Sequence, residues 1–382
     1  MQVLQIIARG VQSSLTFVSS KPSRKAKPAA APMALRLSVV HDDPDHRERR
    51  SVGSHIAALM LDDEWVEIGD QIADWEAELA STPGGLRLHE IAVDVALSGL
   101  QSLIDDAAHN DLSDLADAEI ELGCFVDTWE RSPDSHVLAL LAARAHLLLG
   151  IACRADHWPD RCRQDAWRRM AKHYVAAGDI LSKFDARALM SPLLAEAAYM
   201  QGLGSPGQAH RMPELFENWI TLDPSNPSIF AAHAVWLADS ANASDDDILA
   251  LADASLKRTE LSLGVGGYAL FFQPLLQTRP GCRGLYDPEL YASGLLDLAT
   301  LSATQAEVNR MADSLAGEIK AAGPNAPLAL RDTLLMLIRT EMKVLYPRLW
   351  TLSDEAIRGL IRDARDAMPG ITAVDAPLSR AA

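Results

Sequence analysis

The run Asp165-Ala-Trp-Arg-Arg-Met-Ala-Lys-His-Tyr-Val-Ala-Ala-Gly178 decides the fold class of this chain. Four of its side chains recur with the 3.6-residue period of an α-helix, which predicts that they share one packed face: Trp167, Met170, Ala171 and Tyr174. We expect the helix to end at Gly178, because glycine enters the left-handed C-cap conformation without steric cost. The run therefore predicts a helix that packs closely against other helices.

Outward from this run, a recurring start signal marks further helices. It places an N-capping side chain before a proline, whose missing N–H costs nothing at the first helical position. The signal occurs at Ser132-Pro133, Ser191-Pro192, Asn226-Pro227 and Asp287-Pro288. Ser302-Ala-Thr-Gln305 adds a capping-box pattern. Leu222-Asp-Pro-Ser-Asn-Pro227 predicts a turn between two helices.

Helical patterns separated by short breaks fill most of the chain. We predict helices over residues 54–80, 87–109, 111–130, 137–153, 288–300, 302–322, 326–344 and 353–368. The stretch from Gly264 to Pro274 is less regular than the rest. No stretch alternates with the period of two that is typical of strands. The sequence therefore predicts an all-α protein.

The composition agrees with helices packed on helices. Apolar residues make up 48% of the 382 residues but aromatic residues only 5%, which is unfavourable for a β-sandwich. The formal net charge is −17, and it is unevenly distributed. Residues 1–41 hold six basic and no acidic residues, while the remainder holds 52 acidic against 29 basic residues, a formal charge of −23. A body this acidic repels nucleic acid and anionic membranes, so we expect proteins or small molecules as partners.

The chain divides into an arm, a core and a tail. Residues 1–50 are expected to form a basic arm and a charged linker outside the fold. For the first part of this arm, a disordered tail, a transit peptide and upstream sequence ahead of a true start at Met33 all fit the composition. We expect one helical domain over residues 51–368 and a frayed tail over residues 369–382.

Cysteine usage and hydropathy bear on the compartment. Cys124, Cys153, Cys162 and Cys282 show no tight pairing, which favours reduced thiols in a cytoplasmic compartment. The longest apolar run, Val137–Cys153, is shorter than the roughly 20 residues that a bilayer requires, and it contains Arg144 and His146. It predicts a buried helix.

The spacing Trp167-x-x-Met170-Ala171-x-x-Tyr174-x-x-x-Gly178 resembles the first helix of a tetratricopeptide repeat. Phe230, Ala234, Leu237 and Ala241 echo this spacing after the Leu222–Pro227 turn, which is similar to a linker between two such repeats. Trp167 and Phe230 are 63 residues apart, which departs from two repeats of about 34 residues. The resemblance covers about 75 residues, from Trp167 to Ala241, and implies antiparallel helical hairpins stacked as a short α-solenoid.

The resemblance also implies a binding surface. Residues beside the packed positions of the first helix, here Asp165, Arg168, Lys172 and Val175, would line a concave groove. Two cations one helical turn apart can bind a carboxylate, either an acidic side chain or a peptide C-terminus. Trp158 lies in the same locally basic segment and joins this candidate site. The competing interpretation is a solvated helix face whose arginines pair with acidic residues of the body.

Motifs that would indicate catalysis or a metal site are incomplete. His89-Glu-Ile-Ala-Val93 lacks the second histidine of a zinc-binding helix. Cys153 and Cys162, with His157 between them, lack a fourth zinc ligand. We therefore expect no cofactor and no catalytic residue, and we interpret the chain as a non-enzymatic adaptor that binds a protein segment. Two alternatives stay open: a helical-bundle enzyme or small-molecule binder with a pocket near Tyr268–Phe272, and a regulatory subunit acting through the basic arm.

Overall fold

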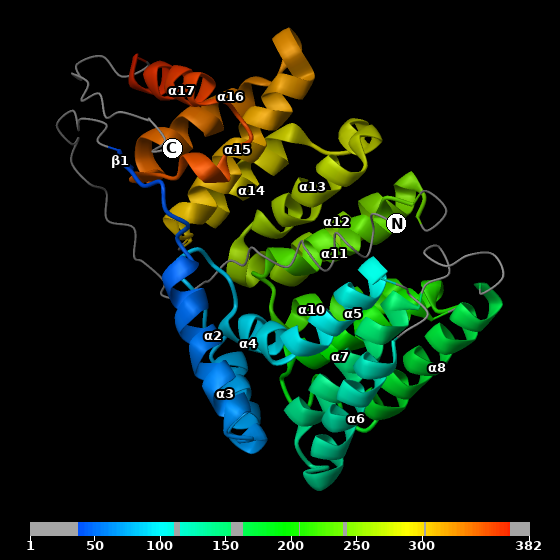
Figure 1. The fold of residues 1–382 in the computed structure, drawn as a ribbon. Coiled ribbons are helices and arrows are strands. Elements are labelled where there is room, and N and C mark those ends of the chain that lie inside the picture. Colours follow the sequence, from blue (N-terminus) through cyan, green and yellow to red (C-terminus); the bar gives the residue numbers. More distant parts are fainter. Residues whose placement is uncertain are drawn as a thin grey trace. The chain divides into compact units, whose positions relative to one another are not determined.

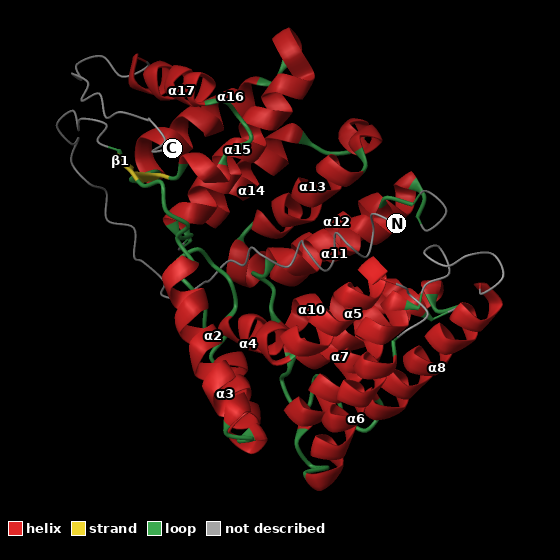
Figure 2. Cartoon of the chain, viewed as in Figure 1, coloured by secondary structure: helices red, strands yellow, loops and turns green. Residues whose placement is uncertain are grey.

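The computed structural model describes residues 37–110, 115–153, 163–205, 207–239, 243–301 and 303–366. Sixteen α-helices, α2 to α17, account for most of these described residues (Figure 2). The strands within this described part are two residues long each. The predicted all-α class is therefore confirmed.

The contacts within the chain group it into two compact units. Of the described residues, unit 1 holds Arg47–Ala80 and Leu86–Pro224, and unit 2 holds residues 37–46, Ser81–Gly85 and residues 225–366. The expectation of a single domain over residues 51–368 stays a prediction. We describe each unit by itself.

Unit 1 is built from helices α2 to α10 (Figure 1). Their bounds are α2 His46–Leu61, α3 Trp65–Ala77, α4 Leu88–Ala96, α5 Ser98–Asn110, α6 Ala116–Arg131, α7 His136–Ala152, α8 Arg163–Leu181, α9 Pro192–Gly204, the 3₁₀ turn η3 Ala209–Arg211 and α10 Met212–Leu222. From α3 to α10, helices that follow one another in the sequence pack against each other, with the most extensive contact between α7 and α8. Helices α7 and α8 therefore form the best-packed pair in unit 1.

Two of the predicted helices are each divided in the structure. The pattern over residues 54–80 forms α2 and α3, because Asp63 takes a left-handed conformation with φ of 59° and ends α2. The pattern over residues 87–109 forms α4 and α5, which meet at Leu97. Hydrophobic periodicity runs on through both breaks, so it does not reveal them.

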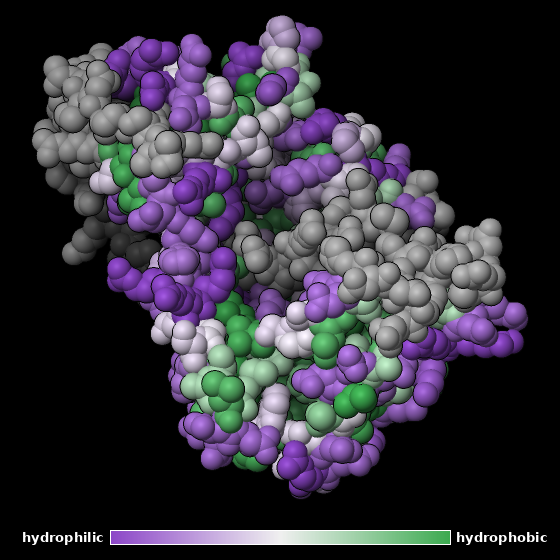
Figure 3. Space-filling view, in the orientation of Figure 1, coloured by the Kyte–Doolittle hydropathy of each residue, from purple (hydrophilic) through white to green (hydrophobic). Residues whose placement is uncertain are grey.

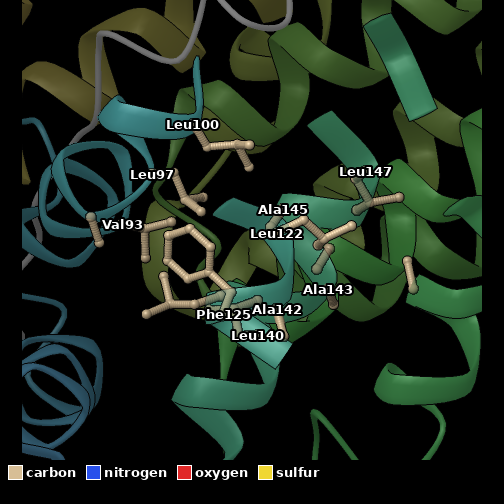
Figure 4. Packing of buried hydrophobic residues seen from close by; sticks show 14 of the residues in the cluster. Val93, Leu97, Leu100, Leu122, Phe125, Leu140, Ala142, Ala143, Ala145 and Leu147 are labelled. Carbon is tan, nitrogen blue, oxygen red and sulfur yellow. The ribbon is translucent and has the colours of Figure 1, made fainter. Parts of the chain in front are cut away.

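The core of unit 1 centres on helices that are apolar on every side. Nearly every residue of α7 and α9 is buried or half-buried, as expected for helices covered all round by other helices. Figure 4 shows side chains of α4 to α7 meeting in this core, including Val93, Leu100, Phe125 and Leu140. The prediction of a buried helix at residues 137–153 is confirmed, since α7 spans His136–Ala152.

Helix α8 differs from its prediction in two respects. Its buried side carries Ala166, Met170, Tyr174, Ala177 and Leu181, whereas Trp167 and Ala171 are exposed. Gly178 also lies inside the helix, which continues to Leu181 because Ile180 and Leu181 are buried. Space at position 178 is limited by the next helix. A Cβ atom there would lie only 3.0 Å from Nε2 of Gln201 on α9.

Unit 2 is also mostly helical, and it contains a small two-stranded sheet. Its bounds are β1 Ser38–Val39, α11 Pro227–Leu237, α12 Asp245–Leu263, α13 Gly266–Thr278, η4 Pro280–Gly284, α14 Pro288–Thr300, α15 Gln305–Ala322, η5 Gly323–Asn325, α16 Leu328–Met336, the π-helical turn η6 Leu337–Glu341, β2 Val344–Leu345, η7 Pro347–Leu349 and α17 Asp354–Asp366. Strand β1 pairs in parallel with β2. Part of the segment expected to lie outside the fold therefore adds a strand to unit 2, and the charged linker ends in the first turn of α2.

Most of the predicted helix starts are confirmed by side-chain caps. The side chains of Ser191, Asn226 and Asp287 each accept a backbone N–H of the helix that follows. The prediction at Ser132-Pro133 is wrong, because Ser135 caps α7 and Ser132 lies at the end of α6. The capping box before α15 is formed by Thr304 with Glu307 instead of residues 302–305, and residue 302 lies outside the described part.

The stretch that we predicted to be irregular, Gly264–Pro274, lies mostly within helix α13. Gly264 ends α12 with φ of 59°, and α13 begins two residues later at Gly266. Pro274 lies inside α13, where it removes one backbone hydrogen bond. Glycine-rich sequence here reflects close helix packing, since a Cβ atom on Gly266 would lie 2.6 Å from Cδ2 of Leu298 on α14.

Candidate protein-binding surface

Helix α8 presents the four predicted binding residues on its exposed side. Arg168 is 70% exposed and Asp165 is 78% exposed, and Lys172 and Val175 are also exposed. Arg168 Nη1 donates to Asp165 Oδ1 over 3.2 Å. This ion pair within α8 agrees in part with the competing interpretation, in which the arginines pair with acidic residues. The structure therefore places these residues together on one surface. Trp158, the fifth candidate, lies outside the described residues.

The same side of α8 carries a row of apolar side chains. Trp167, Ala171 and Val175 are spaced by four residues, which puts them one above the other along the helix. Trp167 is 46% exposed and Val175 is 61% exposed. Single exposed apolar residues are normal, and Figure 3 shows hydrophobic and hydrophilic residues intermixed over the visible face of unit 1. The row on α8 is different because its three members are aligned beside two cations.

The buried side of α8 holds this surface in place. The ring of Tyr174 lies against Gly150 of α7, where a Cβ atom would come within 2.7 Å of it, and Gly204 of α9 contacts the same ring. Arg169 Nη2 donates to Glu119 Oε1 of α6 over 2.8 Å. Contacts with three other helices thus fix the orientation of α8, so its outer face is presented without rearrangement.

Behind Lys172, two histidines join α7 to α8. The Nδ1 atoms of His146 and His173 lie 3.1 Å apart, and the rings point at each other, so one nitrogen donates and the other accepts. Burial lowers the pKa of His173 to about 4, helped by the His146 and Lys172 charges and opposed by Glu119. Burial also lowers the pKa of His146, again assisted by Lys172. Both rings are therefore neutral at pH 7.

This pair predicts that unit 1 loses stability in mild acid. A histidine with a lowered pKa in the folded state stabilises the fold above its unfolded pKa of about 6.5, and this contribution is lost as the pH falls towards about 4. For His173 alone we expect a loss of about 2 kcal/mol in unfolding free energy between pH 7.5 and pH 5. Urea denaturation followed by circular dichroism at the two pH values measures it.

A histidine variant separates the contribution of His173 from that of other buried groups. His233 is one such group, because burial lowers its pKa to about 3. His173→Asn cannot titrate, so its loss of stability on acidification should be smaller than that of the wild type by about 2 kcal/mol. His210→Asn, at an exposed histidine, serves as the control and should behave as the wild type. An identical acid response of His173→Asn and the wild type would contradict the prediction.

A buried ion pair in unit 1 was not predicted from the sequence. Arg144 Nη1 donates to Glu196 Oε1 over 2.8 Å, joining α7 to α9. Asp94 of α4 lies near this pair and is partly exposed to solvent. Loss of hydration around its carboxylate raises the pKa of Asp94 to about 6; the charge of Arg144 opposes this rise and the charge of Glu196 adds to it. The sequence did contain a signal, namely single charged residues inside the otherwise apolar helices α7 and α9. Such residues need buried partners.

Another buried acid caps a helix from a distance. Glu76 Oε1 of α3 accepts the hydroxyl of Ser191 over 2.7 Å and the backbone N–H of Leu193 over 2.8 Å. It thereby satisfies donors at the start of α9, where the helix dipole favours a negative charge. This contact has a structural role, because it fixes the position of α9 relative to α3.

The alternative pocket region contains packed aromatic side chains. Tyr268 and Phe272 of α13 are buried, with ring centroids 4.8 Å apart, and the ring of Phe272 also contacts that of Tyr286. The Tyr268 hydroxyl accepts the backbone N–H of Asp287 over 2.7 Å at the start of α14. These contacts make Tyr268 and Phe272 part of the core of unit 2.

No protein family, no curated protein and no solved structure matches its sequence or fold. Across the described residues, the helices are too short or too polar for any of them to cross a lipid bilayer. In the same part of the chain, no three side chains of His, Cys, Asp or Glu come together as a metal site would require.

Proposed function

We propose that this protein is a non-enzymatic adaptor, and that the outer face of α8 binds a segment of another protein. In this proposal unit 1 is an array of antiparallel helical hairpins of tetratricopeptide-like type. The observation that carries the proposal is the aligned row of Trp167, Ala171 and Val175 beside Arg168 and Lys172, all exposed on one rigidly held helix. Tryptophan and arginine are the residues that most often dominate binding at protein interfaces.

The apolar row supplies the affinity in this proposal. Burying exposed apolar surface contributes about 25 cal/mol per Å². A partner that covers the indole of Trp167 and the side chain of Val175 would gain this contribution without reordering the helix. Such a partner is a helix with apolar residues spaced by three or four positions, which can lie along α8.

The two cations select the partner by charge. Arg168 and Lys172 lie one turn apart, so both can approach a single carboxylate. The existing pair between Arg168 and Asp165 is solvent-exposed and spans one helical turn. Exposed pairs of this kind are weak, and the guanidinium has further donors for a second carboxylate. We therefore infer a partner segment that carries an acidic side chain or its own C-terminal carboxylate.

Charge reversal tests this proposal. Arg168→Glu combined with Lys172→Glu leaves the buried side of α8 untouched and should weaken binding of a purified partner about 10- to 100-fold. Partners are first identified by affinity purification and mass spectrometry with the tagged wild type. Each is then purified and titrated against the wild type and the double variant by isothermal titration calorimetry, with helicity checked by circular dichroism.

The chain offers a matched control on α17. Arg358 and Arg362 are exposed and also one helical turn apart, so Arg358→Glu combined with Arg362→Glu makes the same change in net charge on another helix. The control should bind partners as the wild type does. Two results would show that the outer face of α8 does not bind the partner. In one, the α8 variant binds the partner as tightly as the wild type does. In the other, the α17 variant loses as much affinity as the α8 variant.

A further inference from the structure

A pocket with a volume of about 310 Å³ lies in unit 1, beyond the C-terminal end of α8. Its walls are mostly apolar and come from the end of α8, the turn that follows, α9 and α10: Leu181, Phe184, Ala186, Leu194, Ala195, Ala198 and Leu215. Pockets that hold small ligands begin at about this size. The walls therefore suit an apolar body of modest size, such as one ring or a short alkyl chain.

Three polar residues complete the lining of this pocket: Asp185, Arg187 and Asn218. Asp185 Oδ1 accepts the backbone N–H groups of Arg187 over 2.9 Å and of Ala188 over 3.2 Å, so its carboxylate shapes the turn. Within the described residues, the guanidinium of Arg187 and the amide of Asn218 make no hydrogen bond or ion pair. The donors left for a ligand are thus a guanidinium and an amide.

The turn that carries Arg187 is held by its own backbone. Leu189 N donates to Asp185 O over 3.0 Å, and Ser191 N donates to Ala186 O over 2.8 Å. Met190 takes a left-handed conformation with φ of 54°, which is unfavourable for a side chain of this kind and closes the turn just before α9 begins. A firmly bonded turn holds the backbone of Arg187, an exposed residue, at the edge of the apolar walls, from which its side chain can reach a ligand.

We propose that this pocket binds an amphipathic carboxylate, with its apolar body between α8, α9 and α10 and its carboxylate on Arg187 and Asn218. Arginine binds carboxylates through two parallel N–H···O bonds, which adds directional preference to the charge attraction. This site is separate from the outer face of α8 and does not depend on the function proposed for that face.

A pair of probes that differ only in the polar head tests the proposal. 4-Phenylbutyrate carries a carboxylate on a phenylalkyl body, and 4-phenyl-1-butanol carries a hydroxyl on the same body. Ligand-observed NMR titrations with the full chain should show millimolar binding of the acid, about tenfold tighter than that of the alcohol. Equal binding of both probes, or no binding of either up to its solubility limit, would overturn the proposal.

Variants locate the binding in the pocket. Arg187→Gln should weaken 4-phenylbutyrate about tenfold and leave the alcohol unchanged, whereas Arg211→Gln, at an exposed arginine of η3, should change neither. Ala198→Leu extends a side chain into the pocket and should abolish binding of both probes. Ala195→Leu is used in its place if Ala198→Leu is less helical by circular dichroism. Unchanged binding in Arg187→Gln would exclude the carboxylate role of that residue.

A third experiment distinguishes two kinds of ligand that carry an apolar body and a carboxylate: the C-terminus of a protein, and a free organic acid. An acetylated tetrapeptide with a C-terminal phenylalanine presents the same ring and carboxylate, and its amidated form lacks the charge. Displacement of 4-phenylbutyrate by the free peptide but not by the amide would identify a protein C-terminus as a ligand. Displacement by neither would leave free aromatic or aliphatic acids as the ligands of the pocket.

Discussion

Arg87→Met is expected to lower the unfolding free energy of unit 1 by about 3–5 kcal/mol. The side chains of Arg87 and Asp223 are 1% and 0% exposed, and two hydrogen bonds join them: Nε to Oδ2 over 2.8 Å and Nη2 to Oδ1 over 2.5 Å. Arg87 Nη1 also donates to the backbone carbonyl of Leu79 over 2.8 Å. Removing the arginine leaves the carboxylate of Asp223 buried without its cation, which is the main cost.

A double variant separates this cost from the loss of packing. Arg87→Met combined with Asp223→Leu removes both charges and should recover a large part of the lost stability, because apolar pairs often replace buried ion pairs at little cost. Urea denaturation followed by circular dichroism measures both variants. Asp253→Asn, which breaks the exposed pair with Lys257, is the control and should have no measurable effect. An Arg87→Met variant within 1 kcal/mol of the wild type would contradict the prediction.

Gly294→Ala is expected to destabilise unit 2 by about 1–3 kcal/mol. A Cβ atom on this residue of α14 would lie 2.7 Å from the backbone oxygen of Val265 and 2.8 Å from Cβ of Ala269. Both atoms belong to the rigid start of α13, so the two helices would have to separate. A single methyl group therefore has a large effect at this crossing.

The same substitution elsewhere in unit 2 should have the opposite sign. Gly317 lies inside α15, and a Cβ atom there would meet no atom within 4 Å. Gly317→Ala should therefore stabilise the fold by about 0.5–1 kcal/mol through the better helix propensity of alanine. Thermal and urea denaturation of both variants should show shifts in opposite directions. A Gly294→Ala variant that is as stable as the wild type, or more stable, would mean that the α13–α14 contact does not require glycine.

Local signals in the sequence predicted the helix starts well. Ser191, Asn226 and Asp287 cap their helices as expected, because a cap depends on a few neighbouring residues and on hydrogen bonds within one turn. At Ser132-Pro133 the same signal failed because Ser135, three residues later, provides the cap. The error is local, and a search for the nearest competing cap would have found it.

The buried side of α8 was harder to predict than the helix starts. The tetratricopeptide-like spacing placed Trp167 and Ala171 on the packed side, and the structure exposes both while burying Ala166 and Ala177. The aromatic residue that packs is Tyr174, between Gly150 and Gly204. Periodicity shows that a helix has two sides, but the neighbouring helices decide which side is buried. The predicted residues Arg168, Lys172 and Val175 lie on the exposed side.

Contacts between distant parts of the chain could not be predicted at all. Arg87 and Asp223 are 136 residues apart, and Glu76 and Ser191 are 115 residues apart. Neither pair belongs to a motif with a fixed spacing. Their partners follow only from the arrangement of the helices, so the sequence alone could indicate no more than that charges in apolar surroundings need counter-charges.

Site-specific photo-crosslinking at Ala171 tests the proposed binding surface most directly. A benzoylphenylalanine placed there stands between Trp167 and Val175, and the same group at the fully exposed Leu261 of α12 serves as the control. We predict a covalent adduct with a partner protein at position 171, its loss when Arg168→Glu and Lys172→Glu are added, and no such adduct at position 261. The same adducts at both positions, or an adduct at 171 that survives the charge reversal, would contradict the assignment of α8 as a protein-binding surface.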